Sequence, residues 1–255
     1  MYDFSLQRSM LSVSLELLKD NEIEDIAALG GGTALAAYYW NHRYSTDIDI
    51  FIYSKGKTID KLRPNLWSDK VTKRMKDIGF DGDFKMHPIY TELAIDENSK
   101  MQFFDVNNYT DNPYNRIKLW GLECNIESIG EIIAKKIYYR CEKGNARDLF
   151  DIALAIHKQP DILHDLNIKQ DKIFALYQTV VNIKNDNALS TQYIKEIEQM
   201  NPSKEYTTIA LNTVEYLSLF LENYTSAHSM GIELDNEELS AIEQHVYETI
   251  KSNLE

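Results

Sequence analysis

The feature that most constrains this chain is a run of three glycines, Gly30-Gly31-Gly32, between an apolar stretch and a helix-forming one. Residues 26–29 are Ile-Ala-Ala-Leu, which indicate a buried strand, and residues 33–41 favour a helix. Backbone N–H groups are exposed at such a turn, and the start of a helix favours anionic phosphate. The run has neither the Lys-Ser/Thr of a P-loop nor the spacing of a dinucleotide-binding loop. A phosphate site is therefore predicted, with a tight turn that holds no ligand as the alternative.

A pair of carboxylates follows the glycines. Asp47 and Asp49 alternate with Ile48 and Ile50, and on a strand residues i and i+2 point to the same face. Hard divalent cations such as Mg²⁺ prefer oxygen ligands of this kind. A solvated strand end is the alternative for the pair alone. Together, the turn and the carboxylates predict a site for a nucleoside triphosphate and its metal.

These residues resemble the signature of the AbiEii/AbiGii toxin family (DUF1814), a branch of the polymerase-β-like nucleotidyltransferase superfamily. The resemblance extends through about residue 157. It is carried by Gly31-Gly32-Thr33-Ala34-Leu35 and by His42-Arg43-x-Ser45-x-Asp47-Ile48-Asp49-Ile50-Phe51.

The resemblance implies an α+β fold whose N-terminal nucleotidyltransferase part is a polymerase-β-like mixed sheet with flanking helices. It also implies that Gly31, Gly32 and Thr33 hold the triphosphate, and that Asp47 and Asp49 are catalytic ligands of Mg²⁺ or Mn²⁺. The substrate would be an NTP.

A third carboxylate is a candidate for the same metal site. Asp105 lies near the end of a strand predicted at 101–107, and members of the superfamily often supply a third metal carboxylate from a strand in this order. The alternative is an edge-strand aspartate that faces water, because acids are rarely buried unpaired.

A helical hairpin, predicted from residue 128 to about 157, carries a second group of charges that resembles the family's second motif, a Lys followed by Arg/Lys-Asp-x-x-Asp. By that resemblance Lys136 is the catalytic lysine that contacts phosphate oxygens, with Lys135 as the runner-up. Arg147 would bind the nucleotide as a planar donor. Asp148 or Asp151 would orient the lysine or act as the base. A structural ion-pair network is the alternative.

Two domains are predicted: a nucleotidyltransferase domain at 1–160 and a helical bundle at 161–255. Apolar periodicity indicates a helix at 4–20 and a helix at 58–79 broken near Pro64. The other predicted elements are strands at 24–30, 47–53, 84–87, 90–96 and 101–107, a turn at Lys55-Gly56-Lys57, a loop at 108–116, and C-terminal helices at about 169–182, 190–200, 203–226 and 235–253.

Composition narrows the functional classes. The net charge of −13 argues against a broad nucleic-acid-binding surface, which needs Lys and Arg, although it leaves room for a local basic groove. The two cysteines, Cys124 and Cys141, lack metal spacing and are expected to be reduced thiols of a cytoplasmic protein. No apolar stretch is long enough to predict a membrane span.

The sequence therefore predicts a metal-dependent nucleotidyltransferase that transfers a nucleotide from an NTP to a hydroxyl of RNA, a tRNA 3′ end included, or of a protein. The resemblance implies a toxin with a cognate antitoxin as its partner. Two alternatives stay open: a non-catalytic NTP-binding or regulatory protein on the same fold, and a nucleotidyltransferase that modifies a small molecule or a protein.

Overall fold

The computed structural model describes residues 2–54 and 58–252 and divides the chain into two compact units, Met1–Ser128 and Ile129–Glu255. The turn predicted at Lys55-Gly56-Lys57 lies outside the described residues. The contacts thus place the helical hairpin at 129–158 with the C-terminal helices, whereas the sequence places it in a nucleotidyltransferase domain that ends at 160. That functional boundary stays a prediction. In the described part of the chain, no helix combines the length and the apolar character that a membrane span requires.

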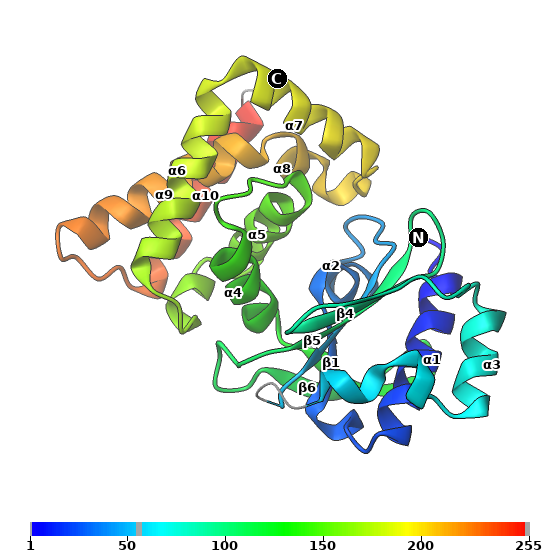
Figure 1. Cartoon of the computed structure of the whole chain (residues 1–255). Coiled ribbons are helices and arrows are strands. Elements are labelled where there is room, and N and C mark those ends of the chain that lie inside the picture. The colour runs from blue at the N-terminus through cyan, green and yellow to red at the C-terminus, as the bar shows by residue number, and fades with distance from the viewer. Residues whose placement is uncertain (1, 55–57, 253–255) are drawn as a thin grey trace. The chain divides into compact units, whose positions relative to one another are not determined.

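The first unit is built on a seven-stranded mixed sheet with the order β3-β4-β5-β2-β1-β7-β6 (Figure 1). β1 runs parallel to β7, and β2 runs parallel to β5, while the other neighbours are antiparallel. The strands are β1 (Ala27–Gly30), β2 (Ile48–Ile52), β3 (Phe84–Met86), β4 (Tyr90–Ala94), β5 (Lys100–Asp105), β6 (Tyr114–Leu119) and β7 (Leu122–Glu127). The predicted α+β class with a mixed sheet is confirmed.

The two faces of the sheet differ in chemistry. Ile48, Ile50 and Ile52 of β2 are at most 1% exposed, and α1 (Ser5–Asp20) packs on β2 and on α3 (Asp69–Asp77). Asp49 points to the opposite side, because successive strand residues alternate. Its register partners are Gly30 of β1 and Gln102 of β5. We call this side of the sheet the Asp49 face.

The second unit consists of helices (Figure 1). Its α5 is buried over most of its length, from Ala146 to Ile156. The four predicted C-terminal segments are helical, although the third is divided into a 3₁₀ turn, α8 and α9. The helices are α4 (Ile129–Arg140), α5 (Ala146–Lys158), α6 (Gln170–Asn185), α7 (Asn187–Gln199), α8 (Thr207–Leu211), α9 (Thr213–Ser229) and α10 (Asn236–Ser252).

Two local predictions need correction. The segment 58–79 is not one helix: two 3₁₀ turns, Ile59–Leu62 and Pro64–Leu66, precede α3, because proline has no N–H to donate and fixes φ. The loop predicted at 108–116 ends earlier, since β6 begins at Tyr114.

The β6–β7 hairpin was missed by the sequence analysis. β6 is an edge strand that exposes Asn115, Arg116 and Lys118, so its apolar alternation is weak. Trp120 and Gly121 both have positive φ, at 51° and 86°, as a tight hairpin turn requires.

Cys124 of this hairpin and Cys141 are free and buried, and burial raises the pKa of the Cys124 thiol to about 11.

Candidate active site

The glycine turn ends β1 and begins a continuous helical segment, with α2 (Gly31–Ala34) followed by a π-helical stretch, Leu35–Trp40. Gly31 has φ +64°, and a Cβ added there would lie 2.2 Å from Oδ2 of Asp49. Only glycine combines that left-handed backbone with the space to admit the carboxylate. The turn and the carboxylate pair are therefore in direct contact.

The two aspartates are both half-buried, whereas Ile48 and Ile50 are buried, so the predicted alternation of the strand is confirmed. Asp49 lies within β2. Asp47 precedes β2, and its Oδ1 accepts a hydrogen bond of 3.3 Å from the backbone N–H of Lys100. Both side chains thus remain partly accessible at the polar end of β2, which an oxygen ligand for a cation requires.

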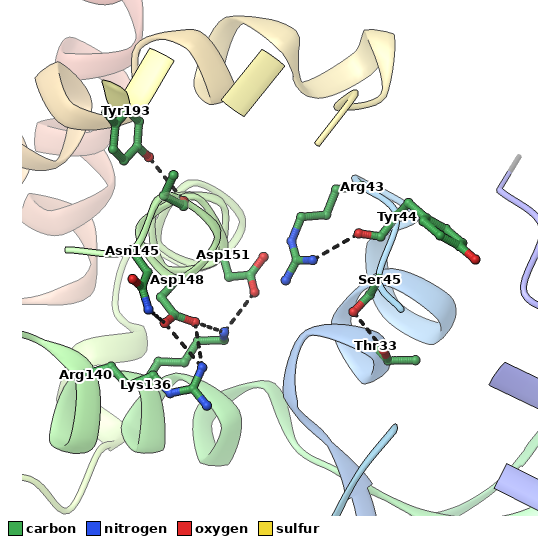
Figure 2. Close-up of polar contacts among 11 residues, drawn as sticks. Thr33, Arg43, Tyr44, Ser45, Lys136, Arg140, Asn145, Asp148, Asp151 and Tyr193 are labelled. Carbon is green, nitrogen blue, oxygen red and sulfur yellow. Dashed lines mark hydrogen bonds and ion pairs between the residues drawn. The ribbon is translucent and has the colours of Figure 1, made fainter. Parts of the chain in front are cut away.

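Thr33 braces the turn through its hydroxyl. The side chain is 1% exposed. Its Oγ1 lies 2.8 Å from Oγ of Ser45 (Figure 2) and 2.5 Å from the carbonyl oxygen of Asp47. These contacts tie the start of the helix to the start of β2. Its hydroxyl therefore positions the backbone of the site.

Arg43 received no individual role in the sequence analysis, although it belongs to the quoted signature. Its side chain is 2% exposed, and a Cβ added at Gly32 would lie 2.3 Å from Nη2 of Arg43. Nη1 donates to the carbonyl oxygen of Tyr44 over 3.1 Å (Figure 2). A guanidinium is always charged, so the glycine turn has a buried cation beside it. Its burial could not be read from a polar stretch of sequence.

The second unit holds the predicted lysine in an ion-pair cluster on α4 and α5. Nζ of Lys136 lies 2.5 Å from Oδ1 of Asp148 and 3.0 Å from Oδ2 of Asp151 (Figure 2). Arg140 approaches Oδ2 of Asp148 at 3.4 Å. Lys136, Asp148 and Asp151 are each at most 7% exposed, so this is a buried charged cluster.

Geometry separates the two lysines that the sequence left open. Lys135 pairs with Glu131 at 3.1 Å, while Lys136 bridges both aspartates of the motif. Burial raises the pKa of Asp148, but the charges of Lys136 and Arg140 outweigh it and hold the pKa below its ordinary value. Asp148 is thus a carboxylate at neutral pH.

A comparison with known protein families shows which family this chain belongs to. The sequence profile of the family described as "Nucleotidyl transferase AbiEii toxin, Type IV TA system" matches residues 15–222. This chain belongs to the AbiEii family. It is a nucleotidyltransferase. No curated protein has a sequence that matches this AbiEii member.

Several solved structures are similar to this AbiEii chain. JHP933 from Helicobacter pylori has 16% identity and a TM-score of 0.47, covering 97% of this chain and 93% of that one. A putative nucleotidyltransferase from H. pylori has 17% identity and a TM-score of 0.48, covering 99% and 97%. The antibiotic-resistance factor ANT(2'')-Ia has 13% identity and a TM-score of 0.43, covering 73% and 96%.

Asp105 does not join the aspartate pair in this AbiEii chain. It is the register partner of Ile52, which puts it on the face opposite Asp49, three residues further along the strand. Its Oδ1 accepts from the hydroxyls of Ser54 and Thr58, the latter at 3.0 Å. The geometry therefore gives Asp105 a structural contact and argues against the predicted role as third metal ligand.

Arg147 is exposed on α5, unlike Asp148 and Asp151. Arg140 of α4, not Arg147, is the arginine that contacts Asp148. The role predicted for Arg147 in binding the nucleotide stays a prediction, and Arg140 is the charged neighbour that sequence spacing did not reveal.

Glu127 lies beside the glycine turn, and the sequence analysis missed it because the β6–β7 hairpin was missed. It is fully buried, and a Cβ added at Gly30 would lie 2.1 Å from its Oε2. Oε1 accepts a hydrogen bond of 2.7 Å from the hydroxyl of Tyr53. The hydroxyl of Tyr39 donates to the carbonyl oxygen of Glu127 at 2.7 Å, and burial is the main cause that raises the pKa of Tyr39 to about 12.

The oxygen donors beside the glycine turn determine which metal ions this site can hold. Within residues 2–54 and 58–252, no group of three or more His, Cys, Asp and Glu side chains is arranged to hold a metal ion. Asp47 and Asp49 nevertheless offer two half-buried carboxylates in contact with the glycine turn. Such oxygen donors fit Mg²⁺ or Mn²⁺ when substrate phosphates and water complete the shell.

Proposed function

We propose that this nucleotidyltransferase uses Mg²⁺ or Mn²⁺, held by Asp47 and Asp49, to transfer a nucleotide from an NTP to a hydroxyl of RNA or protein. The observation that carries this proposal is the contact between Asp49 and Gly31: a Cβ on Gly31 would lie 2.2 Å from Oδ2. The carboxylates suited to the metal thus lie against the backbone suited to the triphosphate.

Within the first unit, each residue has a distinct part. The backbone at Gly31 and Gly32 contacts phosphate oxygens, and Thr33 fixes that backbone to Asp47. Arg43, buried beside Gly32, adds positive charge near the phosphates. When bound, the metal supplies charge neutralisation for the attacking and leaving oxygens.

The Lys136 cluster is proposed to take part in the same reaction. A lysine of this type stabilises charge that develops on the leaving pyrophosphate. Asp148 holds it in place through a contact of 2.5 Å, and Arg147 is proposed as a further donor to the nucleotide. The family is described as a toxin of a type IV TA system, and a cognate antitoxin is the proposed partner of this chain.

The test is transfer from each of four α-labelled NTPs, with Mg²⁺, to total cellular RNA and protein. The wild-type protein should label one class of acceptor, and Asp49→Asn should reduce the label to background, because one of two metal carboxylates is neutralised. Asp77→Asn is the matched control, since Asp77 is an exposed carboxylate at the end of α3.

Transfer by Asp49→Asn at the wild-type rate would contradict the assignment. NTP binding by a folded wild-type protein that labels no acceptor would favour the non-catalytic alternative.

A further inference from the structure

Four aromatic rings form a continuous stack across the Asp49 face. Phe51 of β2 stacks on Phe104 of β5 with 5.1 Å between ring centroids, and Phe104 stacks on Tyr90 of β4 at 5.5 Å. Tyr90 in turn stacks on His87 at 4.2 Å, with 16° between the ring planes. We call these four residues the aromatic ladder.

Register places the ladder next to the proposed metal site. Phe51 and Phe104 are partners, as are Asp49 and Gln102, so the ladder occupies the next row on the same face as Asp49. Two residues along a strand correspond to about 7 Å. The ladder thus begins beside Asp49 and extends away from it over three neighbouring strands.

The outer end of the ladder is open to solvent. His87 is exposed, whereas Phe51, Phe104 and Tyr90 are half-buried. The backbone N–H of His87 donates to the carbonyl oxygen of Tyr90 over 2.9 Å, which holds the two ends of this hairpin loop together. Ile89 in the same loop is 60% exposed. A flat apolar group can therefore continue the stack at an ordered position.

Two cations lie on the same face as the ladder, Lys85 one row and Lys100 two rows away from it by register. Lys85 and Lys100 lie on the Asp49 face by register, with side chains 57% and 38% exposed. They share one counter-ion, Glu92, at 3.1 Å from each lysine. Asp83 is a further carboxylate near Lys85, so the two lysines offer exposed ammonium donors, without a net positive patch, in a chain whose net charge is −13.

We infer that His87, at the end of the aromatic ladder, stacks an unpaired nucleobase of a single-stranded RNA acceptor, whose phosphates contact Lys85 and Lys100. Stacking rings combined with cations are what single-stranded nucleic acids bind. The inference rests on the proposed function and selects RNA over protein as the acceptor.

The base of the NTP is a second flat ring of the kind that stacks on a histidine. His87 follows β3, which is separated from β2 by β4 and β5, so it is three strand spacings, roughly 14 Å, from the strand of Asp49. A strand of several nucleotides spans that interval, whereas an NTP held at the glycine turn would need to bridge it alone. The geometry thus favours the acceptor strand.

The experiment measures binding of a fluorescent single-stranded oligoadenylate RNA to the full chain in the Asp49→Asn background, in which no transfer is expected to interfere. His87→Ala should weaken binding about tenfold, the effect of losing one stacked base. His87→Phe should retain most of the affinity. His245→Ala is the matched control, because His245 is an exposed histidine on α10, and unfolding curves should show that all variants are folded.

Three outcomes would overturn the inference: equal affinity of His87→Ala and the Asp49→Asn parent, no rescue by His87→Phe, or transfer to protein with no RNA binding. A tenfold loss of affinity for a fluorescent ATP analogue on His87→Ala would assign the ring to the NTP and overturn the acceptor assignment. Failure of the proposed function alone would give a different result. In that case no NTP would support transfer, but binding of RNA would still depend on His87.

Discussion

Gly31 is the residue at which the proposed triphosphate site contacts the proposed metal ligand Asp49. Its φ of +64° turns the chain from strand to helix, and the missing side chain leaves room for the carboxylate of Asp49. An L-residue in the left-handed region costs about 1–2 kcal/mol. A methyl group at Gly31 would also collide with the carboxylate of Asp49. A substitution there should therefore strain the backbone and disturb the proposed metal ligand.

Gly31→Ala should therefore lower the free energy of unfolding and abolish most transfer, because the methyl group displaces Asp49. Gly231→Ala is the matched control: its φ is +71° and nothing lies within 4 Å of an added Cβ. It should cost about 1–2 kcal/mol for the backbone alone and keep transfer. Urea unfolding and labelled-NTP transfer measure both. Equal activity of the two variants would contradict the contact.

Lys136 is the second residue whose removal has a defined consequence. Lys136→Met should lower the free energy of unfolding at pH 7 by about 3–5 kcal/mol, because two buried carboxylates lose their counter-ion. The exposed Lys143→Met serves as the control and should change it little.

The pH dependence of that loss has a definite sign. The lowered pKa of Asp148 in the folded protein contributes stability above its ordinary value of 3.8, which is lost as the pH falls through the folded pKa. In Lys136→Met this contribution is gone. Urea unfolding between pH 7 and pH 2 should therefore show a difference between the two proteins that shrinks only below about pH 3.8. A difference that stays constant down to pH 2 would contradict it.

Strand register decides which carboxylates meet. β2 and β5 are parallel, with Asp49 beside Gln102 and Ile52 beside Asp105. A shift of one residue moves a side chain to the other face of a sheet. Asp105 and Asp49 are therefore on opposite faces, although both are aspartates of adjacent strands. The same register brings Phe51 and Phe104 together as one step of the aromatic ladder.

Asp105→Asn should consequently behave unlike Asp49→Asn. It should lower the free energy of unfolding by about 1.5–3 kcal/mol, because hydrogen bonds from Ser54 and Thr58 to a charged acceptor weaken. Transfer by the folded variant should stay close to the wild-type rate. Thermal unfolding and labelled-NTP transfer test this, and a complete loss of transfer with normal stability would restore Asp105 to the metal site.

At the scale of the whole molecule, net charge limits how nucleic acid is bound. A chain with a net charge of −13 cannot rely on a broad cationic surface, so stacking must supply more of the affinity. Lys85 and Lys100, on the same face as the aromatic ladder, are the exposed cations proposed to contact RNA phosphates. Each phosphate contact to a single strand contributes about −0.7 to the slope of log K against log salt.

Binding of oligoadenylate RNA should accordingly have a shallow salt dependence, with a slope of about −1 to −1.5. The double variant Lys85→Gln/Lys100→Gln should flatten it further, while the exposed pair Lys195→Gln/Lys204→Gln should leave it unchanged. Titrations at several salt concentrations give the slopes. A slope of about −4 or steeper would indicate many phosphate contacts and contradict this account.

The sequence by itself determined the local features of this protein. Gly31, Asp47 and Asp49 could be predicted as candidate site residues because glycine conformation and the two-residue period of a strand are properties of short segments. The helical hairpin with Lys136, Asp148 and Asp151 was visible for the same reason. Edge strand β6 escaped detection because its exposed polar residues weaken the alternation, and with it Glu127 was missed.

Only the tertiary structure decided relations between segments distant in the chain. Register between β2 and β5 separated Asp105 from Asp49, and packing of α4 on α5 placed Lys136, and not Lys135, against Asp148 and Asp151. The aromatic ladder joins Phe51, Phe104, Tyr90 and His87 from separate strands and a loop. These outcomes depend on which residues lie opposite one another after folding, which no local period of the sequence encodes.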